Sequence, residues 1–169
     1  IYSKIWFKNF IEYKNHYDDV DLFLPIVVDK NMEGQFVHFS NEPVWAKDFS
    51  EELGFIDNDC LLNFPNFQID GAVIRKEAYE EVGGLKPSIE LYFNYEFFLR
   101  MSYNDKKMMV IPKLGYQKTN MRPSSLFFNY YNGDTKIDPI EARFWFSTAK
   151  KEYFFTKDRE IKYMQGAEA

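Results

Sequence analysis

Segments with the apolar pattern of strands alternate along this chain with segments of helical periodicity, and this alternation limits the fold more than any other feature. Apolar side chains at three- and four-residue steps predict a helix over residues 2–16. The apolar run at 20–28 predicts a buried strand, in which Pro25 indicates an edge position or a bulge. Helices interleaved with apolar strands are typical of α/β domains. The sequence therefore predicts an α/β fold.

Further elements follow this first pair, and several have clear end signals. Gly83-Gly84 is the left-handed stop expected after a short helix. Asp138, Pro139 and Glu141 provide the cap, the first-turn proline and the capping box of a last helix. The expected strands cover residues 35–39, 67–74, 107–111 and 114–119, and the expected helices cover 76–82, 91–103 and 138–150.

The chain has 169 residues and contains no internal repeat and no linker that would divide it. We therefore expect one domain over residues 1–163, followed by a frayed tail at 164–169. Residues 40–66 are the least regular part, and Asp57-Asn58-Asp59 within them is turn-forming. An irregular stretch of this length inside a compact unit favours a binding loop.

Composition excludes several classes of protein. Aromatic residues make up 20% of the chain and can build a core, which excludes disorder. A formal charge of −5 argues against a nucleic-acid partner. The single cysteine, Cys60, excludes a disulfide scaffold and favours a cytoplasmic location. Residues 150–157 mix basic and aromatic side chains that could contact the inner face of a membrane, although intervening acids favour a solvated face.

An ordered series of motifs carries a resemblance to a known family. A strand with Gly71 leads into a short helix, and the turn Gly83-Gly84-Leu85 follows. An acidic helix then ends at Arg100, and a strand ends at Pro112. This order resembles the acceptor half of bacterial family 2 glycosyltransferases, and residues 120–126 are similar to the active-site loop of that family. The resemblance covers residues 1–128.

The resemblance implies a partial GT-A fold, in which helices flank a mixed sheet. It implies inverting transfer of a sugar from a nucleotide-diphosphate sugar to a hydroxyl of a growing glycan, in polysaccharide biosynthesis. The partners would be these two substrates. The alternative is a carbohydrate-binding or protein-interaction domain without chemistry, and a third option is a degenerate transferase half that serves as a scaffold.

The family carries an Asp-x-Asp motif that holds Mg²⁺ or Mn²⁺ and the diphosphate, and this chain has no true counterpart. Asp57-Asn58-Asp59 fits by pattern only. In the family the motif precedes a helix like the one predicted at 2–16, so we expect it upstream of Ile1. The chain would then be the C-terminal part of the enzyme, inactive alone and without a metal of its own. The two histidines, His16 and His38, receive no role.

Inverting transfer needs a carboxylate that takes the proton of the acceptor hydroxyl. Counted back from Arg100, the acid of the family falls on Asn94, which cannot act as a base. The resemblance makes Glu96 the first candidate for the base and Glu90 the second. The alternative is that Glu96 only pairs with Arg100 across one helical turn, as a surface contact.

The remaining candidates would bind substrate. Lys118 and Arg122 could contact phosphate, because an ammonium is a point charge and a guanidinium grips two oxygens. Trp45 could stack on a sugar, and Gly71 could permit close approach of the acceptor. Each candidate has an alternative without a ligand. Lys118 could be a solvated surface lysine, and Arg122 could form a structural ion pair. Trp45 could pack in the core, and Gly71 could form a bulge. The predicted substrate-binding residues are Asp70, Gly71, Trp45, Arg100, Lys118 and Arg122.

Overall fold

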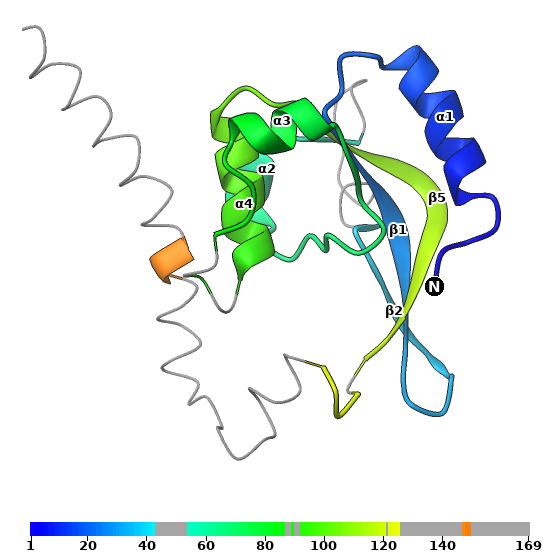
Figure 1. The fold of residues 1–169 in the computed structure, drawn as a ribbon. Helices are drawn as coiled ribbons and strands as arrows, with labels where there is room; N and C mark the ends of the chain where they lie inside the picture. The colour runs from blue at the N-terminus through cyan, green and yellow to red at the C-terminus, as the bar shows by residue number, and fades with distance from the viewer. Residues whose placement is uncertain (43–53, 87–88, 90–91, 121, 126–146, 150–169) are drawn as a thin grey trace, which may run out of the picture.

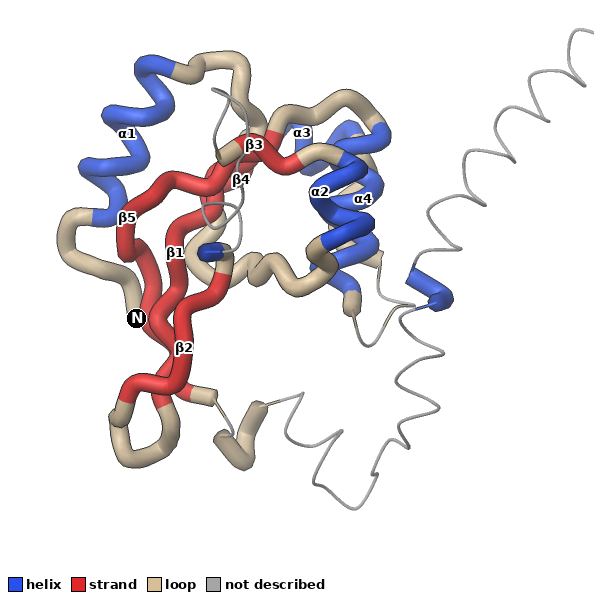
Figure 2. The backbone as a smooth tube through the Cα atoms, turned by 180° about the vertical axis from the view of Figure 1, so that it is seen from behind, coloured by secondary structure: helices blue, strands red, loops and turns tan. Residues whose placement is uncertain are grey.

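A computed structural model describes residues 1–42, 54–86, 89, 92–120, 122–125 and 147–149 of the chain. These residues form an α/β fold with a mixed sheet flanked by helices, as Figures 1 and 2 show from opposite sides. The α/β class expected from the sequence is therefore confirmed. Along the sheet the strand order is β2-β1-β5-β3, and β4 pairs with β1. The strands are β1 (Leu22–Lys30), β2 (Phe36–Ser40), β3 (Phe55–Ile56), β4 (Val73–Ile74) and β5 (Met108–Thr119).

The sheet is mixed because its central strands are parallel while the outer ones are not. β1 runs parallel to β5 and antiparallel to β2 and β4, and β3 runs antiparallel to β5. The helices are α1 (Trp6–His16), α2 (Asn58–Asn63), α3 (Lys76–Glu81) and α4 (Phe93–Tyr103). α1 packs on one face of the sheet, and α2, α3 and α4 pack on the other, as Figure 1 shows.

Alternate residues of β1 belong to two separate cores. Phe23 packs in the smaller core with Trp6 of α1, whereas Leu22 and Leu24 belong to the larger core with α2 and α4. Successive side chains of a strand point to opposite faces. A strand that is covered on both faces needs apolar residues at successive positions, which explains why residues 22–28 are all apolar rather than alternating.

Pro25 lies where the pairing between β1 and β5 becomes irregular. The register shifts between Pro25 and Ile26 and again after Ile26. The bulge that the proline indicated is therefore confirmed, but the edge position is wrong, because β1 lies between β2 and β5. The expected break at Pro112 is also wrong. Residues 108–119 form one strand, since β1 offers a partner along nearly its whole length.

The first helix begins later than the sequence predicts. It starts at Trp6 rather than at residue 2, because the first residues pair with β5 instead. Tyr2 forms a bridge with Tyr116, and the amide of Ser3 donates to the carbonyl of Gly115 at 2.8 Å. Backbone pairing with the sheet thus replaces the first helical turn.

Two other expectations are wrong between residues 57 and 74. Asp57 does not belong to a turn but caps α2, and its side chain accepts from the amide of Cys60 at 2.7 Å. Only Val73–Ile74 of the strand expected over 67–74 is a strand. The helix expected over 76–82 is confirmed, and Gly83 and Gly84 have the predicted left-handed φ values of 80° and 65°.

The helix expected over 91–103 is confirmed as α4. The capping box at 138–141 and the tail at 164–169 lie outside the described residues, so these predictions stay open. Within the part of the chain that the structure describes, no helix has both the length and the apolar character needed to cross a bilayer.

Gly115 of β5 lies directly against Trp6 of α1 and Pro25 of β1. A Cβ there would lie 2.6 Å from Trp6 Cε3 and would also overlap the Pro25 ring. We expect Gly115→Ala to lower the free energy of unfolding by about 1–3 kcal/mol, the usual cost of overpacking. Urea denaturation measures this. Trp6→Leu opens the same space, so the double variant should lose less than the sum of the two single losses. Additive losses would contradict the proposed clash.

Candidate functional site

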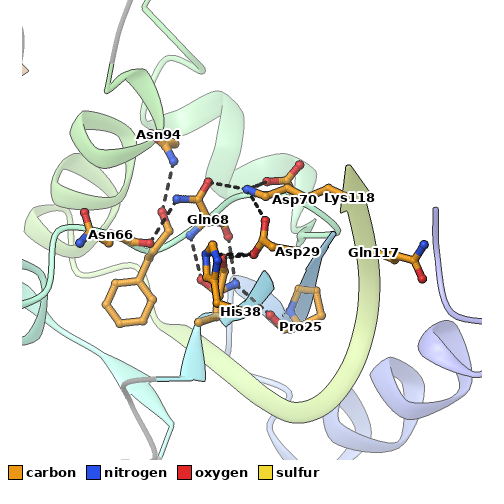
Figure 3. Close-up of polar contacts among 12 residues, drawn as sticks. Pro25, Asp29, His38, Asn66, Gln68, Asp70, Asn94, Gln117 and Lys118 are labelled. Carbon is orange, nitrogen blue, oxygen red and sulfur yellow. Dashed lines mark hydrogen bonds and ion pairs between the residues drawn. The ribbon is translucent and has the colours of Figure 1, made fainter. Parts of the chain in front are cut away.

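Polar side chains gather where the parallel strands β1 and β5 end. Parallel strands bring their carboxyl ends to one edge of a sheet, which is where open α/β sheets bind ligands. Asp29 of β1 is the register partner of Lys118 on β5 and of His38 on β2. Figure 3 shows these residues with Gln68 and Asp70, which come from the loop before β4. We call Asp29, His38, Ser40, Gln68, Asp70 and Lys118 the polar cluster.

Asp29 is the fully buried centre of the polar cluster. Its Oδ2 accepts a hydrogen bond from Ser40 Oγ at 2.5 Å and lies 3.4 Å from His38 Nε2. Its Oδ1 lies 3.4 Å from Lys118 Nζ. A buried carboxylate is costly unless cations and donors surround it. Asp29 therefore holds its neighbours in place, while the His38 side chain is 56% exposed and open to solvent.

Lys118 links the sheet to the loop that carries Gln68 and Asp70. Its Nζ lies 3.1 Å from Gln68 Oε1, 3.3 Å from Asp70 Oδ2 and 3.4 Å from Asp29 Oδ1. The contacts with Gln68 and Asp70 are hydrogen bonds, whereas the contact with Asp29 is an ion pair in which Oδ1 accepts no hydrogen bond. The predicted contact between Lys118 and a diphosphate would have to displace one of them. The alternative of a solvated surface lysine is wrong, because the side chain is only 21% exposed and ion-paired.

The loop at 66–72 is held tightly against the sheet. Asn41, which is buried, donates from Nδ2 to the carbonyls of Pro25 at 2.8 Å and Gln68 at 3.1 Å, and its Oδ1 accepts from the amide of Gln68 at 2.8 Å. Gly71 has a φ of 76°, and a Cβ there would lie 2.8 Å from Tyr116 Cβ. Gly71 therefore allows the loop to approach the sheet closely at Tyr116 of β5. Its predicted contact with an acceptor remains untested.

The start of α4 adjoins the same loop. Asn94 donates from Nδ2 to the carbonyl of Phe67 at 3.2 Å, as Figure 3 shows. Asn94 occupies the position that the resemblance assigns to a catalytic acid. Here the residue holds the loop through a hydrogen bond that a carboxylate could not donate.

Glu96 is fully buried and paired. Its Oε1 and Oε2 accept from Arg100 Nε and Nη2, each at 2.9 Å, and Oε1 lies 3.5 Å from Lys86 Nζ. The predicted pairing with Arg100 is present, but its expected place on the surface is wrong. In this arrangement neither carboxylate oxygen is free to take a proton from a substrate. A catalytic role for Glu96, and a substrate contact of Arg100, would require the ion pair to open.

Three predicted site residues remain, of which the structure describes only Arg122. Trp45 and Glu90 fall outside the described residues. Arg122 is exposed in the segment after β5, where its carbonyl accepts from the amide of Ser125 at 2.8 Å. With the other described residues it forms no ion pair, so its predicted contact with phosphate remains a prediction.

The described residues do not fit a divalent metal ion. No group of three or more His, Cys, Asp or Glu side chains among them is arranged to hold one. Asp29 and Asp70 are the two carboxylates of the polar cluster, but the Lys118 ammonium already lies between them and forms an ion pair with each. That Mg²⁺ or Mn²⁺ binds at an Asp-x-Asp upstream of Ile1 stays a prediction.

Sequence reasoning missed the buried half of the polar cluster, Asp29 and Ser40, together with His38 and Asn41. For Asp29 a signal was present, because an acid directly after a buried apolar strand marks the edge of the sheet where ligands bind. For His38, Ser40 and Asn41 the position in the chain gives no such signal. Their roles come from the pairing of β2 with β1.

Comparison of the chain with protein-family models, with curated proteins and with solved structures finds no match. The structure defines an α/β protein whose mixed sheet carries a polar cluster at the carboxyl ends of its parallel strands. The function therefore has to be argued from the chemistry of this cluster and from the motifs of the sequence.

Proposed function

We propose that this chain is the acceptor-binding part of an inverting family 2 glycosyltransferase with a GT-A-type fold. It would take part in the transfer of a sugar from a nucleotide-diphosphate sugar to a hydroxyl of a glycan. The observation that carries the proposal is the polar cluster, since it lies at the sheet edge where α/β folds bind ligands and includes the loop residues Gln68 and Asp70. The series of motifs over residues 68–112 supports the same assignment.

The side chains of this edge suit a glycan acceptor. Sugar hydroxyls both donate and accept hydrogen bonds, and carboxylate, amide and imidazole groups match them. Asp70 is partly exposed, with Oδ2 held by Lys118 at 3.3 Å, so the loop presents an oriented acid. Orienting the attacking hydroxyl is a large part of what a transferase provides, because a fixed geometry removes the entropy cost of bringing two reactants together.

The test begins with the gene upstream of the codon for Ile1 and continues with the full-length product. We expect an Asp-x-Asp after an apolar strand shortly before Ile1. Release of nucleoside diphosphate from a panel of nucleotide sugars should then depend on an added glycan acceptor. Asp70→Ala should lower kcat/KM for the acceptor by about 10- to 100-fold, the loss of one hydrogen bond to a charged group. Asp19→Ala is the matched control, since Asp19 is an exposed acid that pairs with Lys107 away from the polar cluster.

Two outcomes would contradict the proposal. The first is a reading frame that opens close to Ile1 without an Asp-x-Asp. The second is a full-length product that transfers no sugar from any donor of the panel. If glycans still bind under either outcome, and Asp70→Ala weakens that binding, the chain is a carbohydrate-binding domain without chemistry.

A further inference from the structure

The proposed transfer needs a group that accepts a proton, and neither Asn94 nor Glu96 of α4 offers one. Asn94 has no basic atom on its side chain and donates to Phe67. Glu96 is fully buried, and both of its oxygens accept from Arg100. A general base must come within hydrogen-bond reach of the hydroxyl that it deprotonates. Among the residues described, the polar cluster contains a better candidate.

We propose that His38, oriented by the buried carboxylate of Asp29, accepts the proton of the acceptor hydroxyl. This inference rests on the proposed transferase function. His38 Nε2 lies 3.4 Å from Asp29 Oδ2, and the side chain of the histidine is 56% exposed whereas that of Asp29 is fully buried. A carboxylate beside one ring nitrogen favours the proton on that nitrogen. Nδ1 is then left with its lone pair for the substrate.

The rest of the polar cluster fixes the position of Asp29. Ser40 Oγ donates to the same oxygen that faces His38, at 2.5 Å, and Lys118 Nζ lies 3.4 Å from the other oxygen. The carboxylate therefore cannot turn away from the imidazole without losing two partners. Asp29 is a positioning residue in this arrangement, because it acts through His38 and is buried away from a substrate.

The chemical step balances with the two substrates of the proposed function. The acceptor oxygen forms a bond to the anomeric carbon of the donor sugar, while the bond between that carbon and the diphosphate oxygen breaks. The electron pair of the broken bond leaves with the diphosphate. The hydroxyl proton moves to Nδ1 of His38, and the carboxylate of Asp29 stabilises the resulting imidazolium.

The main test measures transfer by the full-length product with His38→Ala. We expect kcat to fall by about 10²- to 10⁴-fold, the usual contribution of a general base, with KM for the acceptor nearly unchanged. Added imidazole should restore part of the rate, because the exposed position leaves an open space that the small base can enter. His16→Ala is the matched control: His16 is an exposed histidine whose Nδ1 already interacts with the carbonyl of Glu12 at 2.8 Å.

A second readout needs no activity. The chain contains only two histidines, so ¹⁵N imidazole spectra have two sets of signals, and His16→Gln assigns them. At alkaline pH we expect the His38 proton on Nε2, and Asp29→Asn should change this tautomer population. A proton on Nδ1 in the wild-type chain would overturn the inference.

The outcomes separate the inference from the proposed function. If the wild-type product transfers sugar and His38→Ala keeps its kcat, the inference is wrong and the transferase function stands. A loss that imidazole does not restore, together with a raised KM for the acceptor, would make His38 a binding residue only and would also overturn the inference. If the wild-type product transfers no sugar, the proposed function fails, and the inference fails with it.

Discussion

Glu96→Gln is expected to lower the free energy of unfolding of this chain by about 3–5 kcal/mol, the usual cost of breaking a buried ion pair. The substitution removes the negative charge that faces Arg100 and Lys86, while both cations stay in place. Arg100 is buried and also donates to the carbonyl of Val82, so it cannot turn out to water without losing that bond. Urea denaturation followed by far-UV circular dichroism measures the loss.

The chain contains a matched control for this prediction. Lys76 and Glu80 of α3 form an ion pair with the same four-residue spacing, but their side chains are 79% and 62% exposed. Glu80→Gln should change the free energy of unfolding by about 0.5 kcal/mol or less, as for other exposed pairs. Equal losses for Glu80→Gln and Glu96→Gln would contradict the view that burial decides the strength of the pair.

The result also determines how an activity measurement on Glu96 has to be interpreted. A loss of transfer in Glu96→Gln could come from unfolding or from a missing base. Arg100→Met breaks the same ion pair but leaves the carboxylate. If both variants lose transfer in proportion to the folded fraction, Glu96 is structural. If folded Glu96→Gln is inactive while folded Arg100→Met transfers sugar, the prediction that Glu96 is the base is supported.

Gly71→Ala is expected to lower the free energy of unfolding by about 2–5 kcal/mol, because it combines backbone strain with a clash. The φ of 76° costs energy for any residue with a Cβ, and that Cβ would lie 2.8 Å from Tyr116 Cβ and 2.9 Å from Pro25 Cγ. To relieve the clash, the loop at 66–72 has to move off the sheet. Asp70 and Gln68 would then leave Lys118, and binding of a glycan acceptor should weaken with them.

Gly34→Ala separates the two causes. Gly34 has a φ of 81°, close to that of Gly71, but a Cβ there would meet nothing within 4 Å. Its substitution should therefore cost only the strain, about 1–2 kcal/mol. Thermal or urea unfolding of both variants gives the comparison. If Gly71→Ala and Gly34→Ala lower the free energy of unfolding equally, the clash of the added Cβ with Tyr116 and Pro25 does not contribute to the loss.

Local patterns were sufficient for several elements. The run at 20–28 predicted β1, the apolar spacing predicted α1 and α4, and Gly83-Gly84 predicted the left-handed stop after α3. Each of these signals depends on residues within a few positions of one another, so the sequence displays it directly. Expectations failed where a distant strand changed the result. β1 gives residues 108–119 a partner past Pro112, and β5 pairs with the first residues, so the helix begins only at Trp6.

In the candidate site, too, local sequence determined some features and the tertiary structure determined the others. By itself, the sequence determined the α/β class, the four-residue spacing that pairs Glu96 with Arg100, and the presence of Asp70, Gly71 and Lys118 as candidates. Only the tertiary structure decided that the ion pair is buried and that Lys118 binds Asp29 and Asp70. The physical reason is that burial and contacts between residues far apart arise from packing and strand register, which no local pattern encodes.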